Sequence, residues 1–266
     1  AVELLKRGSA DGRRVTWASE LIDRQGRSLS RLIDDLMDVS RISRGRIELR
    51  REVIALNDVL ADALEAIRPL AQDSGHELAV LLPDRKLLVE ADRTRLAQAF
   101  TNLLNNAVKY TDSGGRIEVA VLVEKDQAVV SFRDSGIGIP PERLDDVFEM
   151  FSQVESALSR SRGGLGIGLS LTQRLVQMHG GSIKAHSEGV GRGTRFMVTL
   201  PLSSAAAPTA PEPTAPPQVA PGGGLRVLVA DDNVDAAETQ AALLAEMGHG
   251  VREGHEGEAA GQTAAT

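Results

Sequence analysis

The chain has 266 residues and a formal charge of −7, which argues against a nucleic-acid-binding protein because such a protein would carry a basic face. Hydrophobic residues make up 42% of it but aromatic residues only 3%, so aliphatic side chains must fill most of its core. It contains no cysteine and no apolar run of about 18 residues, which excludes disulfides, thiolate zinc sites and a membrane segment and fits a cytoplasmic protein.

A long helix is predicted over residues 13–42, where apolar side chains recur at helical spacing between charged ones. The apolar stripe is too broad for a single surface helix and favours a helical bundle or coiled coil, with an amphipathic helix packed on its own domain as the alternative. Gly45 is expected to end this helix. The alternation in residues 46–50 then predicts a strand, and Asn57 is predicted to cap the next helix.

Strands and helices alternate through the middle of the chain. Strands are predicted over residues 77–82, 86–90, 116–124, 127–133, 182–187 and 194–200. Asp92 should cap a helix that extends to about Lys109. A short helix should begin at Pro140, and a longer one should follow Gly168 and end at His179. These elements predict an α/β unit with a mixed sheet on one side and helices on the other.

The C-terminal part of the chain has a different composition. Residues 203–224 contain six of the eleven prolines and nothing apolar enough to fold, so we predict a linker over residues 202–224. A buried strand should follow from Leu225 and end in two acidic residues, Asp231 and Asp232. A helix over about 235–247 comes next.

Four polar residues, Asn102, Asn106, Lys109 and Tyr110, gather on one face of the helix that Asp92 should cap, while its apolar face points at the sheet. Asparagine is a poor residue for a helix interior, so its repetition here carries a propensity cost. An asparagine carbonyl suits Mg²⁺, which keeps most of its water and bridges phosphates. Asparagines on a solvated helix face are the simpler alternative.

A first glycine cluster follows Asp134 and contains Gly136 and Gly138. A carboxylate at the end of a strand, beside glycines that allow close backbone approach, can accept the amino proton of adenine. Guanine presents a carbonyl at that position, so such a carboxylate would select adenine. An ordinary turn is the alternative explanation.

A second glycine cluster, with Gly164 and Gly166, leads into the helix predicted after Gly168. Successive amides of a glycine-rich turn and the start of a helix together favour a polyphosphate, although a flexible loop has the same composition. The sequence Gly-x-x-x-x-Gly-Lys-Ser/Thr does not occur anywhere in the chain, so a P-loop is excluded.

In this order and spacing, Asn102–Thr111, Asp134–Ile139 and Gly163–Leu169 resemble the ATP-binding domain of bacterial sensor histidine kinases, in the Bergerat (gyrase, Hsp90, kinase, MutL) superfamily. Residues 147–151 resemble the family's F box, and residues 152–162 resemble its mobile lid. The resemblance implies ATP and Mg²⁺ as cofactors, with Asn106 as the Mg²⁺ ligand and Asn102 beside it. It also implies Lys109 near the phosphates and Tyr110 over the adenine. Arg160 or Arg162 would reach the γ-phosphate.

Residues 13–50 resemble the second helix of the family's dimerisation and phosphoacceptor hairpin, which implies a homodimer through residues 1–50. The phosphoacceptor histidine would precede Ala1, so we expect no autophosphorylation of this chain. His76 lies in His-Glu-Leu, a sequence that mimics an acceptor motif, but it enters a predicted strand and is interpreted as coincidence. His179 should serve as a cation or a cap at a helix end.

Residues 225–266 resemble the start of a response-regulator receiver domain, with Asp231 and Asp232 as its Mg²⁺-binding acids and its phosphoacceptor aspartate expected beyond Thr266. The predicted domains are 1–50, 51–201, a linker over 202–224, and 225–266. The predicted fold class is α+β: a helical dimerisation segment, a Bergerat-type α/β sandwich and an incomplete doubly wound receiver fragment.

The resemblance implies the catalytic part of a hybrid sensor histidine kinase, which passes the γ-phosphoryl group of ATP to a histidine and then to an aspartate. That aspartate would belong to a response regulator or to the protein's own receiver domain. Another Bergerat-fold ATPase and a non-catalytic scaffold that dimerises and binds ATP are the alternatives.

Overall fold

The computed structural model describes residues 12–43, 48–152, 166–204, 225–231 and 233–254. The chain divides into two compact units, residues 1–209 and residues 210–266. No helix among the described residues is both long and apolar enough to cross a lipid bilayer.

A five-stranded mixed sheet forms the centre of the first unit, as predicted, with the strand order β2-β4-β5-β7-β6. The strands are β2 (Glu77–Leu81), β4 (Arg116–Glu124), β5 (Gln127–Asp134), β6 (Ser182–His186) and β7 (Thr194–Pro201). β2 is parallel to β4, and every other neighbouring pair is antiparallel. The predicted β4–β5 hairpin is confirmed, and Lys125 makes its tight turn with a φ of 54°.

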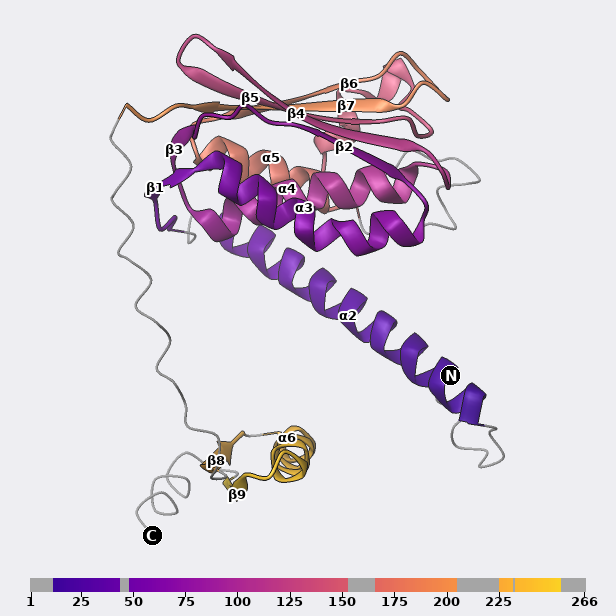
Figure 1. Ribbon diagram of the computed structural model, residues 1–266, viewed down its shortest axis with the longest axis vertical. Helices are drawn as coiled ribbons and strands as arrows, with labels where there is room; N and C mark the ends of the chain where they lie inside the picture. Colours follow the sequence, from indigo (N-terminus) through magenta and orange to yellow (C-terminus); the bar gives the residue numbers. More distant parts are fainter. Residues whose placement is uncertain (1–11, 44–47, 153–165, 205–224, 232, 255–266) are drawn as a thin grey trace. The chain divides into compact units, whose positions relative to one another are not determined.

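Three helices cover one face of this sheet, α3 (Leu56–Asp73), α4 (Arg93–Tyr110) and α5 (Gly168–Met178), as Figure 1 shows. The apolar stripe of α4 is buried as predicted, and the ring of Phe100 lies 5.4 Å from that of Phe132 on β5. Two single-turn 3₁₀ helices, Pro141–Arg143 and Asp146–Phe148, follow β5, and Pro140 caps the first of them. The helix α4 therefore packs its apolar face into the core, and its polar face lies outside the core.

The strand predicted over residues 46–50 is wrong at residues 48–50, and residues 46 and 47 lie outside the described residues. Residues 48–50 are not in a strand, and the strand β1 (Glu52–Ala55) instead pairs antiparallel with β3 (Leu88–Ala91) in a separate two-stranded sheet. The backbone N–H of Arg50 donates to the carboxylate of Asp92 at 3.0 Å, so this segment lies against the start of α4. Alternation over five residues could not reveal that long-range partner.

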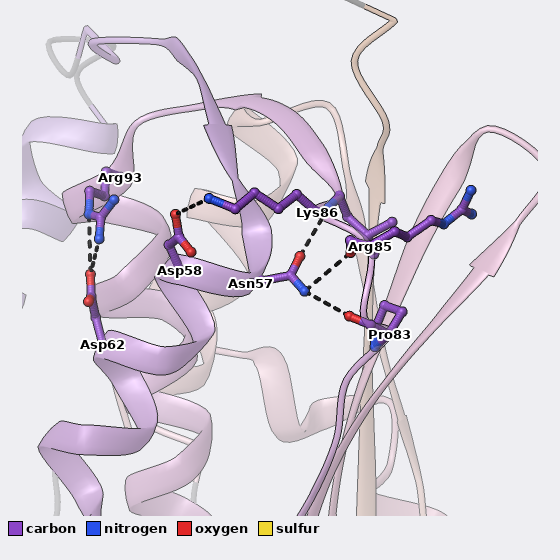
Figure 2. Close-up of polar contacts among 8 residues, drawn as sticks. Asn57, Asp58, Asp62, Pro83, Arg85, Lys86 and Arg93 are labelled. Carbon is purple, nitrogen blue, oxygen red and sulfur yellow. Dashed lines mark hydrogen bonds and ion pairs between the residues drawn. The ribbon is translucent and has the colours of Figure 1, made fainter. Parts of the chain in front are cut away.

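Asn57 does not cap α3, which begins one residue earlier with Ala55 as a cap that makes no side-chain hydrogen bond. Instead the Asn57 amide donates to the carbonyls of Pro83 and Arg85 at 3.1 and 3.4 Å, and its oxygen accepts from the N–H of Leu87 at 3.0 Å (Figure 2). The helix starts early because Leu56 is fully buried and its own N–H donates to Leu87. Asn57 therefore holds the loop between β2 and β3.

Asp92 caps α4 as predicted, since its side chain accepts from the N–H of Arg95 at 3.1 Å. Its own N–H donates to Nε2 of His179 at 3.0 Å, and Nδ1 of that ring donates to the Leu175 carbonyl at 2.7 Å. Burial lowers the pKa of the His179 imidazole. His179 is thus a neutral cap that joins two helix ends, and the cationic role considered for it is wrong.

The helix α2 (Gly12–Ser43) spans the range predicted for the first long helix. Large apolar side chains exposed along it are Val15, Trp17, Ile22, Leu29, Ile33, Leu36 and Met37. Near its end the buried carboxylate of Asp38 accepts from the side chains of Arg95 and Gln98 on α4. That ion pair joins α2 to the start of α4.

The second unit contains β8 (Arg226–Ala230), α6 (Val234–Glu246) and β9 (Gly250–Gly254). The predicted strand and helix are both present, and β9, which was not predicted, pairs parallel with β8. Val229, Ala237 and Ala241 form a small core. Asn233 caps α6 by accepting from the N–H of Ala236 at 3.2 Å.

Asn57→Ala should lower the free energy of unfolding by about 1–3 kcal/mol, because it leaves backbone groups of the β2–β3 loop without their partner. Urea unfolding measures the loss. Asp62→Asn is the matched control on the same helix: its ion pair with Arg93 is half exposed, so less than about 1 kcal/mol should be lost. Equal losses in the two variants would contradict the role of Asn57.

Candidate functional site

The carboxyl group of Asp134 lies at the end of β5 and is only 7% exposed. Its Oδ1 accepts from the N–H of Gly136 at 2.9 Å and from the N–H of Thr194 at 3.2 Å. Burial raises the pKa of this carboxyl, and the two amide hydrogen bonds partly oppose that rise. No hydrogen bond to Oδ2 occurs within the described part of the chain, so one acceptor oxygen of a largely buried carboxyl remains available.

Gly136 lets the turn after Asp134 pass directly over the end of α4. A Cβ at this position would lie 2.3 Å from the carbonyl oxygen of Tyr110, so a side chain is sterically excluded. The same carbonyl accepts from the N–H of Ile137 at 3.1 Å. This close approach brings Asp134 and Tyr110, predicted separately from two motifs, to one place.

Asn102 faces the start of α5. Its amide nitrogen is buried without a hydrogen-bond partner, and it lies 3.9 Å from the position a Cβ would take on Gly168. An unsatisfied buried donor costs about 1–3 kcal/mol, which is a reason to look for an absent acceptor. The start of α5 adds free backbone donors and a positive dipole end. The Asn102 amide and the start of α5 together therefore have the character of an anion-binding site.

Asn106 lies one helical turn after Asn102 and is half buried. Its side chain makes no hydrogen bond among the residues that the structure describes, so its carbonyl oxygen is available as a ligand. Lys109 and Tyr110 interact with each other: the ammonium nitrogen is 2.9 Å from the tyrosine oxygen and 4.5 Å from the ring centroid. The four polar residues of the α4 face therefore do share one region.

The ends of the loop before α5 are joined by a hydrogen bond from the N–H of Phe151 to the carbonyl of Gly166, at 3.1 Å. Gly166 has a φ of +70°, and a Cβ there would lie 2.7 Å from the carbonyl of Ser152. The predicted phosphate-binding residues Arg160, Arg162 and Gly164 lie outside the described residues. Of the lid predicted over residues 152–162, only Ser152 therefore lies among the described residues.

Two functional candidates were missed by the sequence analysis, Ser187 and Thr194, which flank the glycine-rich turn between β6 and β7. Both are buried, and both donate or accept at the turn that follows Asp134. Gly138, with a φ of +69°, packs against this turn so closely that a Cβ would lie 2.1 Å from the carbonyl of Gly189. The Ser187 hydroxyl beside a glycine turn was the available signal, whereas the Thr194 contact is made by a backbone N–H and has no signal in the residue type.

In the second unit, the side chain of Asp231 accepts from the N–H of Asn233 at 2.9 Å. Asp232 lies outside the described residues. No cluster of three or more histidine, aspartate or glutamate side chains that could hold a metal ion occurs in the described ranges. Mg²⁺ binding by these two acids stays a prediction.

Residues 91–204 match the family described as "Histidine kinase-, DNA gyrase B-, and HSP90-like ATPase". The autoinducer 2 sensor kinase/phosphatase LuxQ of Vibrio cholerae is 36% identical over 78% of this chain and 25% of its own length. The histidine protein kinase DivJ of Caulobacter vibrioides is 36% identical over 73% of this chain and 33% of its own. The chain thus spans a quarter to a third of these two curated relatives.

Among solved structures, full-length ShkA in complex with AMPPNP is 26% identical to this chain, with a TM-score of 0.62. The match covers 97% of this chain and 52% of that one. That structure contains an ATP analogue, and its likeness extends beyond the residues of the family match.

The buried charge of Asp134 leads to a prediction about stability without nucleotide. Because folding raises the carboxyl pKa above its ordinary value of 3.8, the folded protein binds more protons than the unfolded chain between 3.8 and the raised pKa. Stability is therefore lost as the pH rises through that window. Asp134→Asn, which keeps an acceptor for both amides, should be more stable than the parent chain at pH 7 and should lose this advantage below pH 3.8.

Urea unfolding at the two pH values tests this prediction. Asp126→Asn, which changes an exposed carboxyl in the β4–β5 turn, is the control and should show no such pH-dependent gain. If Asp134→Asn were less stable than the parent chain at neutral pH, that result would contradict the idea that the ionised, desolvated carboxylate lowers the stability of the fold.

Proposed function

The chain carries the ATP-binding domain of a sensor histidine kinase, and from this premise we propose that it binds Mg·ATP and transfers the γ-phosphoryl group to a histidine in two-component signalling. The observation that carries the proposal is the buried Asp134 carboxylate, one oxygen of which accepts no hydrogen bond from the described residues. In the proposal Oδ2 accepts the adenine amino proton. Gly136 and Gly138 let the nucleotide approach the backbone, and Tyr110 covers the base.

The phosphates are proposed to lie between α4 and the start of α5. The amide of Asn102, which has no partner in the described ranges, and the first N–H groups of α5, which have no acceptor within that helix, support this position because they can donate to an anion. Lys109, farther along the same helix as Asn102, would add a positive charge. The sequence pattern alone supports phosphate binding by Arg160, Arg162 and Gly164. For Gly166, its hydrogen bond with the N–H of Phe151 supports the proposal as well.

Mg²⁺ would be held by the carbonyl oxygen of Asn106, which has no protein partner in the described ranges. A bound Mg²⁺ would neutralise charge on the phosphates. The residues of the chain then orient the γ-phosphoryl group, and most of the catalysis comes from positioning and charge stabilisation.

We also propose roles for the other parts of the chain. Residues 1–50 would belong to the dimerisation hairpin, residues 51–201 to the catalytic domain and residues 225–266 to a receiver fragment containing Asp231 and Asp232. The β-α-β order of the second unit supports a receiver. The phosphoryl group would pass from a histidine to an aspartate of this receiver or of a separate response regulator. A cytoplasmic location stays a prediction of the composition.

The proposed homodimer is supported by α2, whose exposed apolar side chains would be covered by a second copy. An isolated helix with such a surface is unfavourable in water, because its apolar side chains stay exposed to solvent. In a dimer the stripe would become the core of a helical bundle.

An ATP titration by calorimetry, with and without Mg²⁺, tests the nucleotide site. We expect saturable binding by the parent chain, a loss of about tenfold or more in Asp134→Asn, and binding insensitive to Mg²⁺ in Asn106→Ala. Asp126→Asn should bind like the parent. A folded parent chain that binds no ATP would overturn the proposal and favour the non-catalytic scaffold.

Sedimentation equilibrium tests the homodimer. Leu29→Glu and Ile33→Glu, at side chains of α2 that are 59% and 54% exposed, should shift the chain toward monomer because they place charge in the proposed interface. Leu122→Glu is the matched control, since Leu122 is 62% exposed on the sheet and should leave the association unchanged. A parent chain that is monomeric at all concentrations would contradict the proposed dimer.

A further inference from the structure

Ser187 is a buried polar residue outside every motif that the sequence analysis singled out. It follows β6 directly and is 7% exposed. Its hydroxyl donates to the carbonyl of Gly193 at 2.7 Å. It accepts from the N–H of Ile139 at 3.0 Å and from the N–H of Gly189 at 3.3 Å. One side chain therefore holds backbone groups from three places in the chain.

The hydroxyl of Ser187 is fully used by these contacts. A serine hydroxyl has one hydrogen to donate and two lone pairs to accept, and the three hydrogen bonds occupy all of them. The Gly189 carbonyl, at 3.3 Å, is a longer alternative acceptor for the same hydrogen. Removing the hydroxyl would leave N–H groups at a buried site without a partner, which is costly because a buried donor without an acceptor keeps its desolvation penalty.

These contacts tie the glycine-rich β6–β7 turn to the turn that follows Asp134. Three more hydrogen bonds join the same two turns: Gly191 N–H to the Ile137 carbonyl at 2.7 Å, Gly193 N–H to the Gly136 carbonyl at 3.1 Å, and Thr194 N–H to Asp134 at 3.2 Å. The last of these holds the carboxylate itself. The β6–β7 turn therefore helps to hold the Asp134 carboxylate, together with the N–H of Gly136.

The two turns meet with backbone packed on backbone. A Cβ on Gly193 would lie 2.0 Å from the Asp134 carbonyl, and a Cβ on Gly138 would lie 3.1 Å from the Ser187 oxygen. Among the side chains at this junction in the described part of the chain, the Asp134 carboxylate and the Ser187 hydroxyl each bond both turns. Ser187 therefore adds to the backbone hydrogen bonds that set the register between the turns.

We propose that Ser187 is a positioning residue for nucleobase selection: by locking the β6–β7 turn to the Gly136–Ile139 turn, it holds Oδ2 of Asp134 where it accepts from adenine and rejects guanine. The inference rests on the proposed function, in which Asp134 meets the base. Ser187 touches no ligand in this role. It acts through Thr194 and the two turns, so its loss should affect which base is bound as well as how tightly.

The test compares the affinities of the full chain for ATP and for GTP in the parent and in Ser187→Ala, by calorimetric titration. The parent should prefer ATP. In Ser187→Ala we expect ATP to bind about tenfold more weakly, the size of effect typical for removal of a buried acceptor, with a smaller change for GTP. The ratio of the two affinities should therefore fall. A general loss of folded protein lowers both affinities equally and leaves the ratio unchanged.

Asn57→Ala is the matched control, because it also removes hydrogen bonds to backbone groups but in the β2–β3 loop. It should keep the parent ratio. Ser187→Cys is the second variant: it nearly conserves volume and replaces the hydroxyl by a weak donor and acceptor, so its ratio should fall as well. This variant guards against a failure of Ser187→Ala to fold.

The outcomes separate the two proposals. A parent chain that binds no ATP overturns the proposed function, and the role of Ser187 with it. A parent chain that prefers ATP, together with serine variants that keep the parent ratio, overturns the role of Ser187 alone. A ratio that falls equally in Asn57→Ala also overturns it, since the effect would then follow stability and not the junction of the turns.

Discussion

The site depends on a carboxylate buried at the end of a central strand. Burying a charged group is costly unless hydrogen bonds compensate for the lost water, and the compensation for Asp134 comes from the amides of Gly136 and Thr194. These amides belong to segments nearly 60 residues apart in the sequence. Both turns must therefore be in place for these hydrogen bonds to stabilise the ionised carboxylate at the end of β5. The glycines allow the two turns to approach this closely, because a side chain at those positions would clash with backbone atoms.

The helix α4 connects this carboxylate to the rest of the domain. Its apolar face packs on the sheet, and its C-terminal carbonyl at Tyr110 supports the turn after Asp134. Asn102, in its middle, faces the start of α5. At its N-terminus Asp92 joins the Arg50 backbone and His179, and Arg95 meets Asp38 of α2. One helix thus spans the distance between the proposed nucleotide site and the contact with α2.

Local sequence predicted well wherever the deciding interaction was local. Asp92 caps α4 because its side chain reaches an N–H three residues away, and the β4–β5 hairpin forms around its own turn. The errors share a different cause. Asn57, Arg50 and His179 each bond a partner 30 to 87 residues away. A pattern over a few neighbouring residues contains no information about such a partner.

The order of the asparagine helix and the two glycine clusters was enough, by itself, to show the resemblance to the ATP-binding domain of sensor histidine kinases, and the family match over residues 91–204 confirms the domain type. Only the tertiary structure decided how the pieces meet. It left the Asn102 amide without a partner opposite α5, directed both amides onto one oxygen of Asp134, and used Ser187 to join two turns. Those are long-range contacts that no local pattern specifies. They depend on the strand order β2-β4-β5-β7-β6, which brings β7 beside β5.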